Sequence, residues 1–256
     1  MLQPIITLFL TLPFDHSQQL FLVSLYNLVK FTSPAFIFGI IFTVIRKNDQ
    51  QAKLPLKSYF SDQWDNNFFP TFAWTLFYLI AMPNLQQHGH FHNIATFIWQ
   101  FFSDNATPHL WYSVMMLQFL LIMPGIKSVC NWVQHSYRRL LIAVISSGII
   151  YFAWLIFYDH FILNGPEATH WYLLDRIFIS FLIFGLYGGL SWNFHHEIQT
   201  FLFTYWWLIV GFYLLTYFRT RDLFLATFKL TDLTNDSYYL PSMAIYALTV
   251  ILLIYL

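Results

Sequence analysis

Three histidines occupy alternate positions in the segment LQQHGHFHNIATF, at His88, His90 and His92. In an extended segment this spacing puts the three imidazoles on one side, where they could bind a metal ion. On a helix, side chains two residues apart point to different sides, and no carboxylate follows nearby. Histidine is also common at the wet edge of a membrane, so the sequence predicts no metal site.

Lys30 lies inside a long apolar stretch, where an ionisable residue costs free energy and marks a functional site by default. The alternative is that the membrane span begins near Thr32. In that case Lys30 would reach the headgroup region by extending its side chain along the helix. Both interpretations stay open.

Asp175 and Arg176 directly precede the apolar stretch that begins at Ile177. The two side chains could pair or face a polar cavity at the bilayer edge, or they could anchor the helix at the interface. A second polar group, the sequence HHE that begins at His195, is interpreted as a turn between helices.

The most distinctive string is His109-Leu110-Trp111-Tyr112, at the start of the apolar segment SVMMLQFLLIMP. Tryptophan and tyrosine are enriched at membrane interfaces, so this string is typical of an aromatic belt, with His109 at the helix start. A role in a substrate cavity is the alternative.

The elements that carry these residues must be membrane helices. The chain is 58% hydrophobic and 9% charged, against roughly 45–50% and 25% in soluble domains. Its 12 basic and 12 acidic residues cancel, which gives no sign of a nucleic-acid surface. Cys130 is the single cysteine, which excludes an intrachain disulfide. The predicted fold class is an all-α, polytopic transmembrane bundle.

Apolar stretches predict roughly seven to eight spans, since a crossing needs about 20 residues. The chain reads as one domain over residues 1–256, and the weak stretch from Ile94 is suited to the interface. The stretches run from Leu20 to Ile45, Phe68 to Met82, Ile94 to Phe102, Leu110 to Met123, Leu140 to Phe157, Ile177 to Leu190, Phe201 to Phe218 and Met243 to Leu256.

The distribution of basic residues predicts the orientation, because short cytoplasmic loops are enriched in lysine and arginine. The loops after the first and third full spans hold seven of them, which predicts that both loops are cytoplasmic. The loop from Pro83 to Pro108 has none and is expected outside. The seven residues are Arg46, Lys47, Lys53, Lys57, Lys127, Arg138 and Arg139.

Four strings occur in an order that resembles the acyltransferase 3 family of membrane enzymes. They are FTSPAFIFGIIFTVIRK, FFPTFAWTLFYLI, HLWYSVMMLQFLLIMP and DRIFISFLIFGLYGG. Within the family the chain looks most like the branch that modifies or exports surface polysaccharides of Gram-positive bacteria, such as poly-N-acetylglucosamine. The resemblance covers nearly the whole chain and implies a multi-pass protein of a bacterial plasma membrane.

The resemblance implies O-acyl transfer from a cytoplasmic donor, commonly acetyl-CoA, to a hydroxyl of a cell-surface or lipid-linked sugar. No cofactor is expected to be bound, and acyl-CoA is the expected co-substrate. The alternative is a transport protein that exports a polysaccharide or a lipid-linked precursor. The residues carried over as substrate-cavity or framework positions are Pro34, His109, Trp111, Tyr112, Asp175 and Arg176.

The chain also departs from the family pattern. The family's catalytic histidine ends its first membrane helix, and the present sequence begins about where that residue would stand. Gln63 stands where the family commonly has an arginine before the proline of the second span, here Pro70. The late spans of the family have no counterpart after Leu256. These departures predict a family member trimmed at both ends, whose activity is uncertain.

Overall fold

Every regular element in the described part of this computed structural model is a helix, so the prediction of an all-α fold is confirmed there. The described residues are 16–50, 56–86, 90–103, 105–107, 110–134, 136–163, 165, 171, 174, 176–227 and 239–256. The elements are α2 (His16–Lys30), α3 (Thr32–Gln50), α4 (Leu56–Gln63), the π-helical η1 (Trp64–Phe68), α5 (Phe69–Ala81), the 3₁₀ turn η2 (Pro83–Leu85), α6 (Ile94–Phe102), α7 (Trp111–Val133), α8 (Tyr137–Tyr158), the π-helical η3 (Asp159–Leu163), the 3₁₀ turn η5 (Phe178–Phe181), α9 (Leu182–Asn193), α10 (His195–Thr227) and α11 (Pro241–Tyr255).

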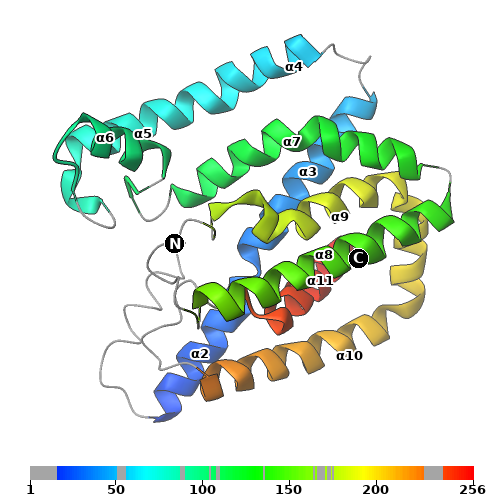
Figure 1. The fold of residues 1–256 in the computed structure, drawn as a ribbon. Coiled ribbons are helices and arrows are strands. Elements are labelled where there is room, and N and C mark those ends of the chain that lie inside the picture. Colours follow the sequence, from blue (N-terminus) through cyan, green and yellow to red (C-terminus); the bar gives the residue numbers. More distant parts are fainter. Residues whose placement is uncertain are drawn as a thin grey trace.

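The short helix α9 lies at the centre of the bundle. It is apolar on all sides, and most of its residues are buried, as expected for a helix without a polar face. It contacts α3, α7, α8 and α10, and its contact with α3 is the most extensive between any two elements. Figure 1 shows α9 between α7 and α8, with α3 passing behind it.

Glycines on α9 allow this close packing. A Cβ atom added at Gly188 would overlap the backbone carbonyl of Phe38 on α3, and one at Gly185 would lie 2.5 Å from the Phe119 ring on α7. Small residues let helix backbones approach each other in membrane bundles. The two glycines therefore fix how α9 sits against α3 and α7.

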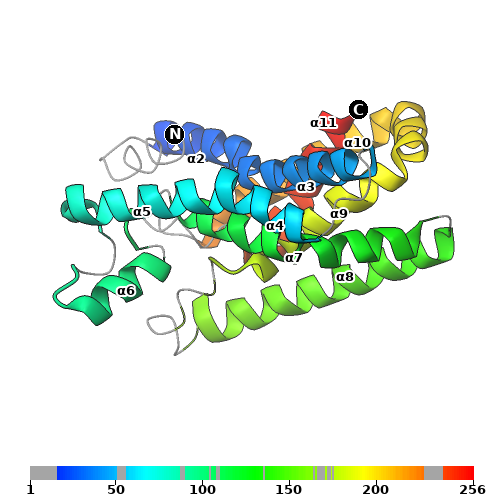
Figure 2. The same cartoon turned by 90° about the horizontal axis from the view of Figure 1, so that it is seen from above.

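A second packing group joins α2, α10 and α11. The buried side chains of Val23 and Tyr26 on α2 pack with those of Met243, Tyr246 and Val250 on α11. Helix α10 contacts both α2 and α11 and covers the group from outside. In Figure 2 the continuous stretch α4–η1–α5 lies along another side of the bundle, with α6 folded near its end.

Helix α10 is bent at Tyr205, whose backbone angles, φ −114° and ψ 21°, are not helical. The first arm, from His195, turns away from the direction of the other long helices, and the second arm crosses back under the bundle to contact α2 (Figure 1). A bend of this kind comes from a local break in the helical backbone, as kinks generally do.

Four helical stretches among the described residues are long and apolar enough to cross a membrane: Leu20–Lys47, Tyr112–Val133, Tyr137–Ile162 and His195–Leu223. This is fewer than the seven to eight spans predicted from the sequence. Two further predicted spans are shorter apolar helices, Phe178–Asn193 and Pro241–Tyr255. The stretch at Ile94 forms a helix of only nine residues. The stretch at Phe68 continues a helical run whose preceding residues, WDNN, include polar side chains that lower its mean hydropathy.

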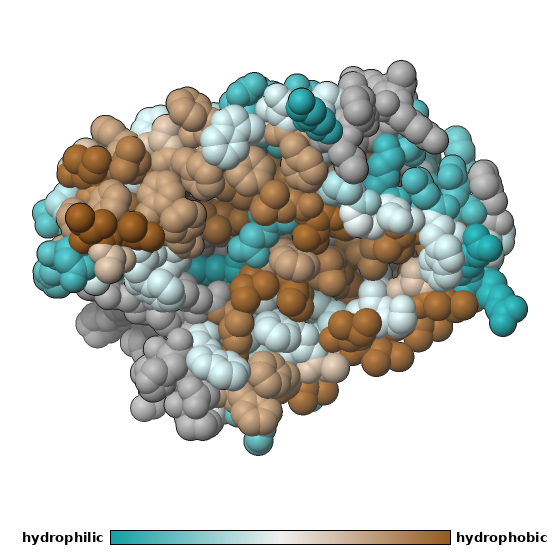
Figure 3. All heavy atoms as spheres, turned by 45° about the horizontal axis from the view of Figure 1, so that its top comes forward, coloured by the Kyte–Doolittle hydropathy of each residue, from teal (hydrophilic) through white to brown (hydrophobic). Residues whose placement is uncertain are grey.

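Large apolar side chains cover much of the outer surface. On α8, Leu141, Ile145 and Ile149 are each more than half exposed, and brown, apolar residues dominate the face shown in Figure 3. Soluble monomers rarely expose continuous apolar patches of this extent. The surface is therefore suited to contact with lipid chains.

The helix ends that flank the two basic loops lie together. Figure 1 places the end of α3, the start of α4, the end of α7 and the start of α8 at one end of the bundle. The start of α2, helix α6 and the end of α10 lie at the other end. This arrangement agrees with the expectation that the two basic loops share one side of the membrane.

Candidate functional site

The residues carried over from the family resemblance fall on α3, α7 and the approach to α9. Pro34 is buried in the first turn of α3. Trp111 begins α7, although its side chain lies outside the described part, and Tyr112 packs against the main core. His109 and Asp175 lie outside the described residues.

Arg176 is the best-defined member of this set. Its side chain is only 8% exposed. The guanidinium Nη1 donates hydrogen bonds to the backbone oxygen of Ser103 at 2.8 Å and to Oδ1 of Asn105 at 3.0 Å. Both acceptors are neutral, buried groups of the segment that follows α6. An arginine that anchors a helix at the membrane interface would instead be exposed.

The amide nitrogen of Asn105 holds this side chain in place. Its Nδ2 donates a 2.7 Å hydrogen bond to the Ser103 hydroxyl, and its side chain is fully buried. A buried amide needs its hydrogen bonds made, because each missing bond costs free energy. The pairing with Ser103 therefore orients the amide so that its oxygen faces Arg176.

Gln118 joins α7 to the segment that carries Arg176. Its Nε2 donates to the Arg176 backbone oxygen at 3.0 Å, and its Oε1 accepts from the Phe178 backbone N–H at 2.9 Å. Between these two groups, Ile177 has extended backbone angles (φ −88°, ψ 138°), so the helical hydrogen-bond pattern is broken there. One glutamine thus supplies both a donor and an acceptor for this segment.

Helix α8 supports the same segment from the other side. The indole Nε1 of Trp154 donates to the Ser180 hydroxyl at 3.1 Å, and that hydroxyl donates to the Leu174 backbone oxygen at 3.0 Å. The residues around Arg176 are thereby tied to α7, α8 and the loop after α6. We call Ser103, Asn105, Gln118 and Arg176 the Arg176 cluster.

Lys30 is buried at the end of α2, with a side chain 1% exposed. Its Nζ donates a 2.6 Å hydrogen bond to the Tyr26 hydroxyl and lies 4.8 Å from the centre of the Tyr26 ring. The headgroup interpretation expected the ammonium group to extend to the surface. In the structure it does not. A buried charge of this kind keeps Lys30 as a functional candidate.

Side-chain hydrogen bonds tie the Lys30 region to α10. Asn27 Nδ2 donates to the Tyr217 backbone oxygen at 3.1 Å, and the Tyr217 hydroxyl donates to the Ser24 backbone oxygen at 3.1 Å. These two bonds fix how α2 lies against α10. The buried lysine thus lies in a rigid contact rather than at a loose helix end.

His195 lies at the opposite end of the bundle. Its Nδ1 is 2.5 Å from the Tyr255 hydroxyl on α11, and its ring stacks on Trp192. Trp192 in turn donates from Nε1 to Asp49 on α3 at 2.8 Å. The sequence HHE was interpreted as a turn, but in the structure it begins α10 and joins the ends of α3, α9 and α11.

The histidine-rich segment contributes no cluster that the structure describes. His90 and His92 are exposed, and His88 lies outside the described residues. Across the described part of the chain, no three metal-ligating His, Cys, Asp or Glu side chains come together.

Sequence reasoning missed the neutral members of the Arg176 cluster. Gln118 sits alone in the apolar run of α7, and nothing near Asn105 in the sequence marks it as a partner of a buried charge. An uncharged amide inside an apolar run is the signal that could have found Gln118, because buried polar groups in membrane helices bond across helices. Its partners, 58 and 60 residues away, could not be read from the sequence.

Comparison with family models, with curated proteins and with solved structures finds no match to this chain.

Proposed function

We propose that this chain is a multi-pass protein of a bacterial plasma membrane with the activity of a membrane-bound O-acyltransferase. It would move an acyl group, acetyl from acetyl-CoA, to a hydroxyl of a cell-surface or lipid-linked sugar. The proposal rests on the resemblance to the acyltransferase 3 family.

One structural observation supports the proposal best: three of the strings that carry the resemblance pack against one another. Gln118, from the HLWY string, binds both Arg176 and Phe178 of the DRIF string. Gly188, near the end of that same string, contacts the backbone of Phe38 in the PAFIF string. The strings were compared with the family by their order along the sequence. In the structure they are also neighbours in space, as parts of one site must be.

A seven-crossing topology belongs to the same proposal. The stretch from α4 to α5 is one continuous helical run, Leu56–Ala81. Helices α9 and α11 would cross as short central helices. A helix of 15 residues such as α11 is about 22 Å long, less than the ~30 Å hydrocarbon core. Longer neighbours surround both short helices, which would shield their ends from lipid.

In this proposal Arg176 binds a negative charge. A guanidinium presents several N–H donors in a plane and retains its charge when buried, so it is suited to a phosphate, a carboxylate or a developing oxyanion. Its bonds to Ser103 and Asn105 use Nη1 and fix the plane of the group. The sugar hydroxyl also needs a general base, and we assign that role to no described residue.

Transport is a second candidate, favoured by a specific observation. The stretch Leu20–Lys47 is interrupted at Phe31 between α2 and α3, directly after the buried Lys30. Interrupted helices with a charge inside the span mark substrate sites in many transporters. In this alternative, the chain would move a polysaccharide or lipid-linked precursor without changing it.

The test is to replace Arg176 in cells that make the protein and to measure two quantities on the surface glycan: its amount and its acyl content. Arg176→Gln and Gln118→Leu are compared with Arg221→Gln, which removes an arginine paired with the adjacent Asp222 at the surface. The level of each variant in the membrane fraction reports folding, and Arg176→Lys retains the charge without the planar donor group.

Acyl transfer predicts that Arg176→Gln lowers acyl content severalfold while the amount of surface glycan and the Arg221→Gln control stay unchanged. Normal acyl content in a well-folded Arg176→Gln variant would overturn the role of Arg176. Loss of exported glycan with a normal acyl content per sugar would favour transport instead.

A further inference from the structure

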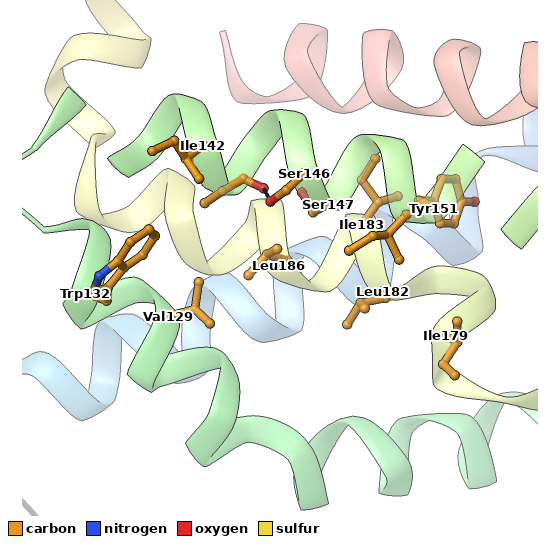
Figure 4. A pocket seen from close by; sticks show the side chains of 12 residues that line it. Val129, Trp132, Ile142, Ser146, Ser147, Tyr151, Ile179, Leu182, Ile183 and Leu186 are labelled. Atoms are coloured by element: carbon orange, nitrogen blue, oxygen red, sulfur yellow. Dashed lines mark hydrogen bonds between the residues drawn. The ribbon is translucent and has the colours of Figure 1, made fainter. Parts of the chain in front are cut away.

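An apolar groove of about 340 Å³ runs between α7, α8 and α9. Figure 4 shows side chains from all three helices around it, with Trp132 near one end and Ile179 and Tyr151 near the other. The rim residues Ile142 and Ile150 are about half and more than half exposed, so the groove opens to the outer surface. The lining residues are Val129, Trp132, Ile142, Ala143, Ser146, Ser147, Ile150, Tyr151, Ile179, Leu182, Ile183 and Leu186.

The two serines do not make the groove polar. Ser146 donates its hydroxyl to the Ala143 backbone oxygen at 3.3 Å, and Ser147 donates to the Val144 backbone oxygen at 3.1 Å. Each donor is therefore used within α8 itself. A sugar would find few partners along this surface, whereas a hydrocarbon chain needs none.

One end of the groove carries a fixed positive charge. Arg139 Nη1 donates to the Trp132 backbone oxygen at 3.0 Å, and the guanidinium carbon lies 5.8 Å from the centre of the Trp132 ring. Arg139 is exposed, so its remaining N–H groups can bind an anion. On α8 it is four residues before Ala143 and seven before Ser146, which places it on the helix face that lines the groove.

The length of the groove suits one leaflet. Along α8 it extends from Ile142 to Tyr151, which is about 13 Å at 1.5 Å per residue. Half of a ~30 Å hydrocarbon core is about 15 Å. A chain entering beside Arg139 would therefore end near the middle of the bilayer.

We propose that this groove binds one acyl chain of an anionic phospholipid whose phosphate is held by Arg139. The apolar walls take the chain, Trp132 lies at the level of the glycerol region, and Arg139 supplies the charge complementary to the phosphate. The proposal rests on the membrane placement of the protein, but it does not depend on acyl transfer.

The test measures lipid binding by the full chain, purified in detergent and reconstituted with phosphatidylglycerol or phosphatidylcholine of the same chain length. Native mass spectrometry counts the lipids retained by each variant. Arg139→Gln removes the charge, and Arg138→Gln is its control because Arg138 is an exposed neighbour on a different face of α8. Ser146→Trp fills the groove, and Ile149→Trp adds the same bulk at an exposed position that does not line it.

The expected result is preferential retention of phosphatidylglycerol by the wild type and by both controls, because the choline cation of phosphatidylcholine offsets the phosphate charge that Arg139 binds. Arg139→Gln should bind it on the order of tenfold more weakly, the effect of losing one charge-assisted hydrogen bond. Ser146→Trp should lose retention of both lipids. Equal retention by all variants would overturn the proposal, as would equal affinity of the wild type for the two headgroups. A change of oligomeric state in Ser146→Trp with unchanged lipid retention would assign the groove to a second copy of the chain and would also overturn it.

Discussion

Gly188 on α9 faces the backbone carbonyl of Phe38 on α3 with no room for a side chain between them. This contact joins two helices whose residues are about 150 positions apart in the chain. Because the obstructing atom belongs to the backbone, it cannot swing away as a side chain could. The contact fixes how α3 lies against the centre of the bundle.

Gly188→Ala should therefore destabilise the protein by about 1–3 kcal/mol, the usual cost of overpacking a core. Thermal unfolding in detergent, followed by the loss of monodisperse protein, measures the effect. The control is Gly211→Ala, where an added methyl group meets nothing within 4 Å. That change should be neutral or slightly stabilising, since alanine is the better helix former. Equal melting temperatures for the two variants would contradict the close contact.

Gly185→Ala should be milder and can be rescued. Here the nearest atom is Cε1 of the Phe119 ring, 2.5 Å from the added Cβ, and a ring can be replaced by a smaller group. We expect Gly185→Ala with Phe119→Leu to be more stable than Gly185→Ala alone. A double-mutant cycle measures the coupling, and additive effects would show that the two positions do not meet.

Tyr26→Phe should destabilise the protein because it removes an acceptor from a buried cation. The Lys30 ammonium donates to that hydroxyl at 2.6 Å, and a hydrogen bond to a buried charged group contributes about 1.5–3 kcal/mol. Tyr137→Phe is the control, since its hydroxyl makes a 3.4 Å contact with Glu197 at the surface. An unchanged melting temperature for Tyr26→Phe would mean that Lys30 is satisfied by other groups.

Two threonines on α10, one turn apart, should respond differently to replacement by valine. Thr216 donates to the Phe212 backbone oxygen at 2.9 Å and lies 3.3 Å from the Thr249 hydroxyl on α11. Thr220 is fully buried, and among the described residues its hydroxyl has no hydrogen-bond partner. Thr216→Val should destabilise by about 1 kcal/mol, whereas Thr220→Val should be neutral or stabilising. The melting temperatures of the two variants decide the point, and a loss at Thr220 would reveal a polar partner.

The sequence predicted the helical class and the positions of most helices because these helices coincide with apolar runs bounded by polar residues. It could not predict that α9 is central, since apolar composition does not say which helix faces its neighbours on all sides. It overestimated the number of long spans because buried helices such as α9 and α11 are apolar without being long.

The candidate site was predicted less completely. Arg176 was found because a charge at the start of an apolar run is conspicuous. Asn105 and Ser103 were not, because they are ordinary loop residues until the fold brings them within 3.0 Å of the guanidinium group. The sequence also did not determine the burial of Lys30. A long side chain inside an apolar helical stretch can extend along the helix to the surface or stay buried against a neighbouring helix.

The contact between Gly188 and Phe38 also limits how this protein can move. Two helices that touch backbone to backbone have no flexible side chain between them to absorb a displacement, so we expect α3 and α9 to move together in a conformational change. Helix α8 is packed differently: hydrogen bonds from Trp154 to Ser180 and from Tyr187 to the Val144 backbone oxygen join it to the centre, but part of its boundary with α7 and α9 is an open groove. If the protein alternates between states, we expect α8 to move relative to the pair α3–α9. A lipid chain bound in the groove would then change the rate of that movement.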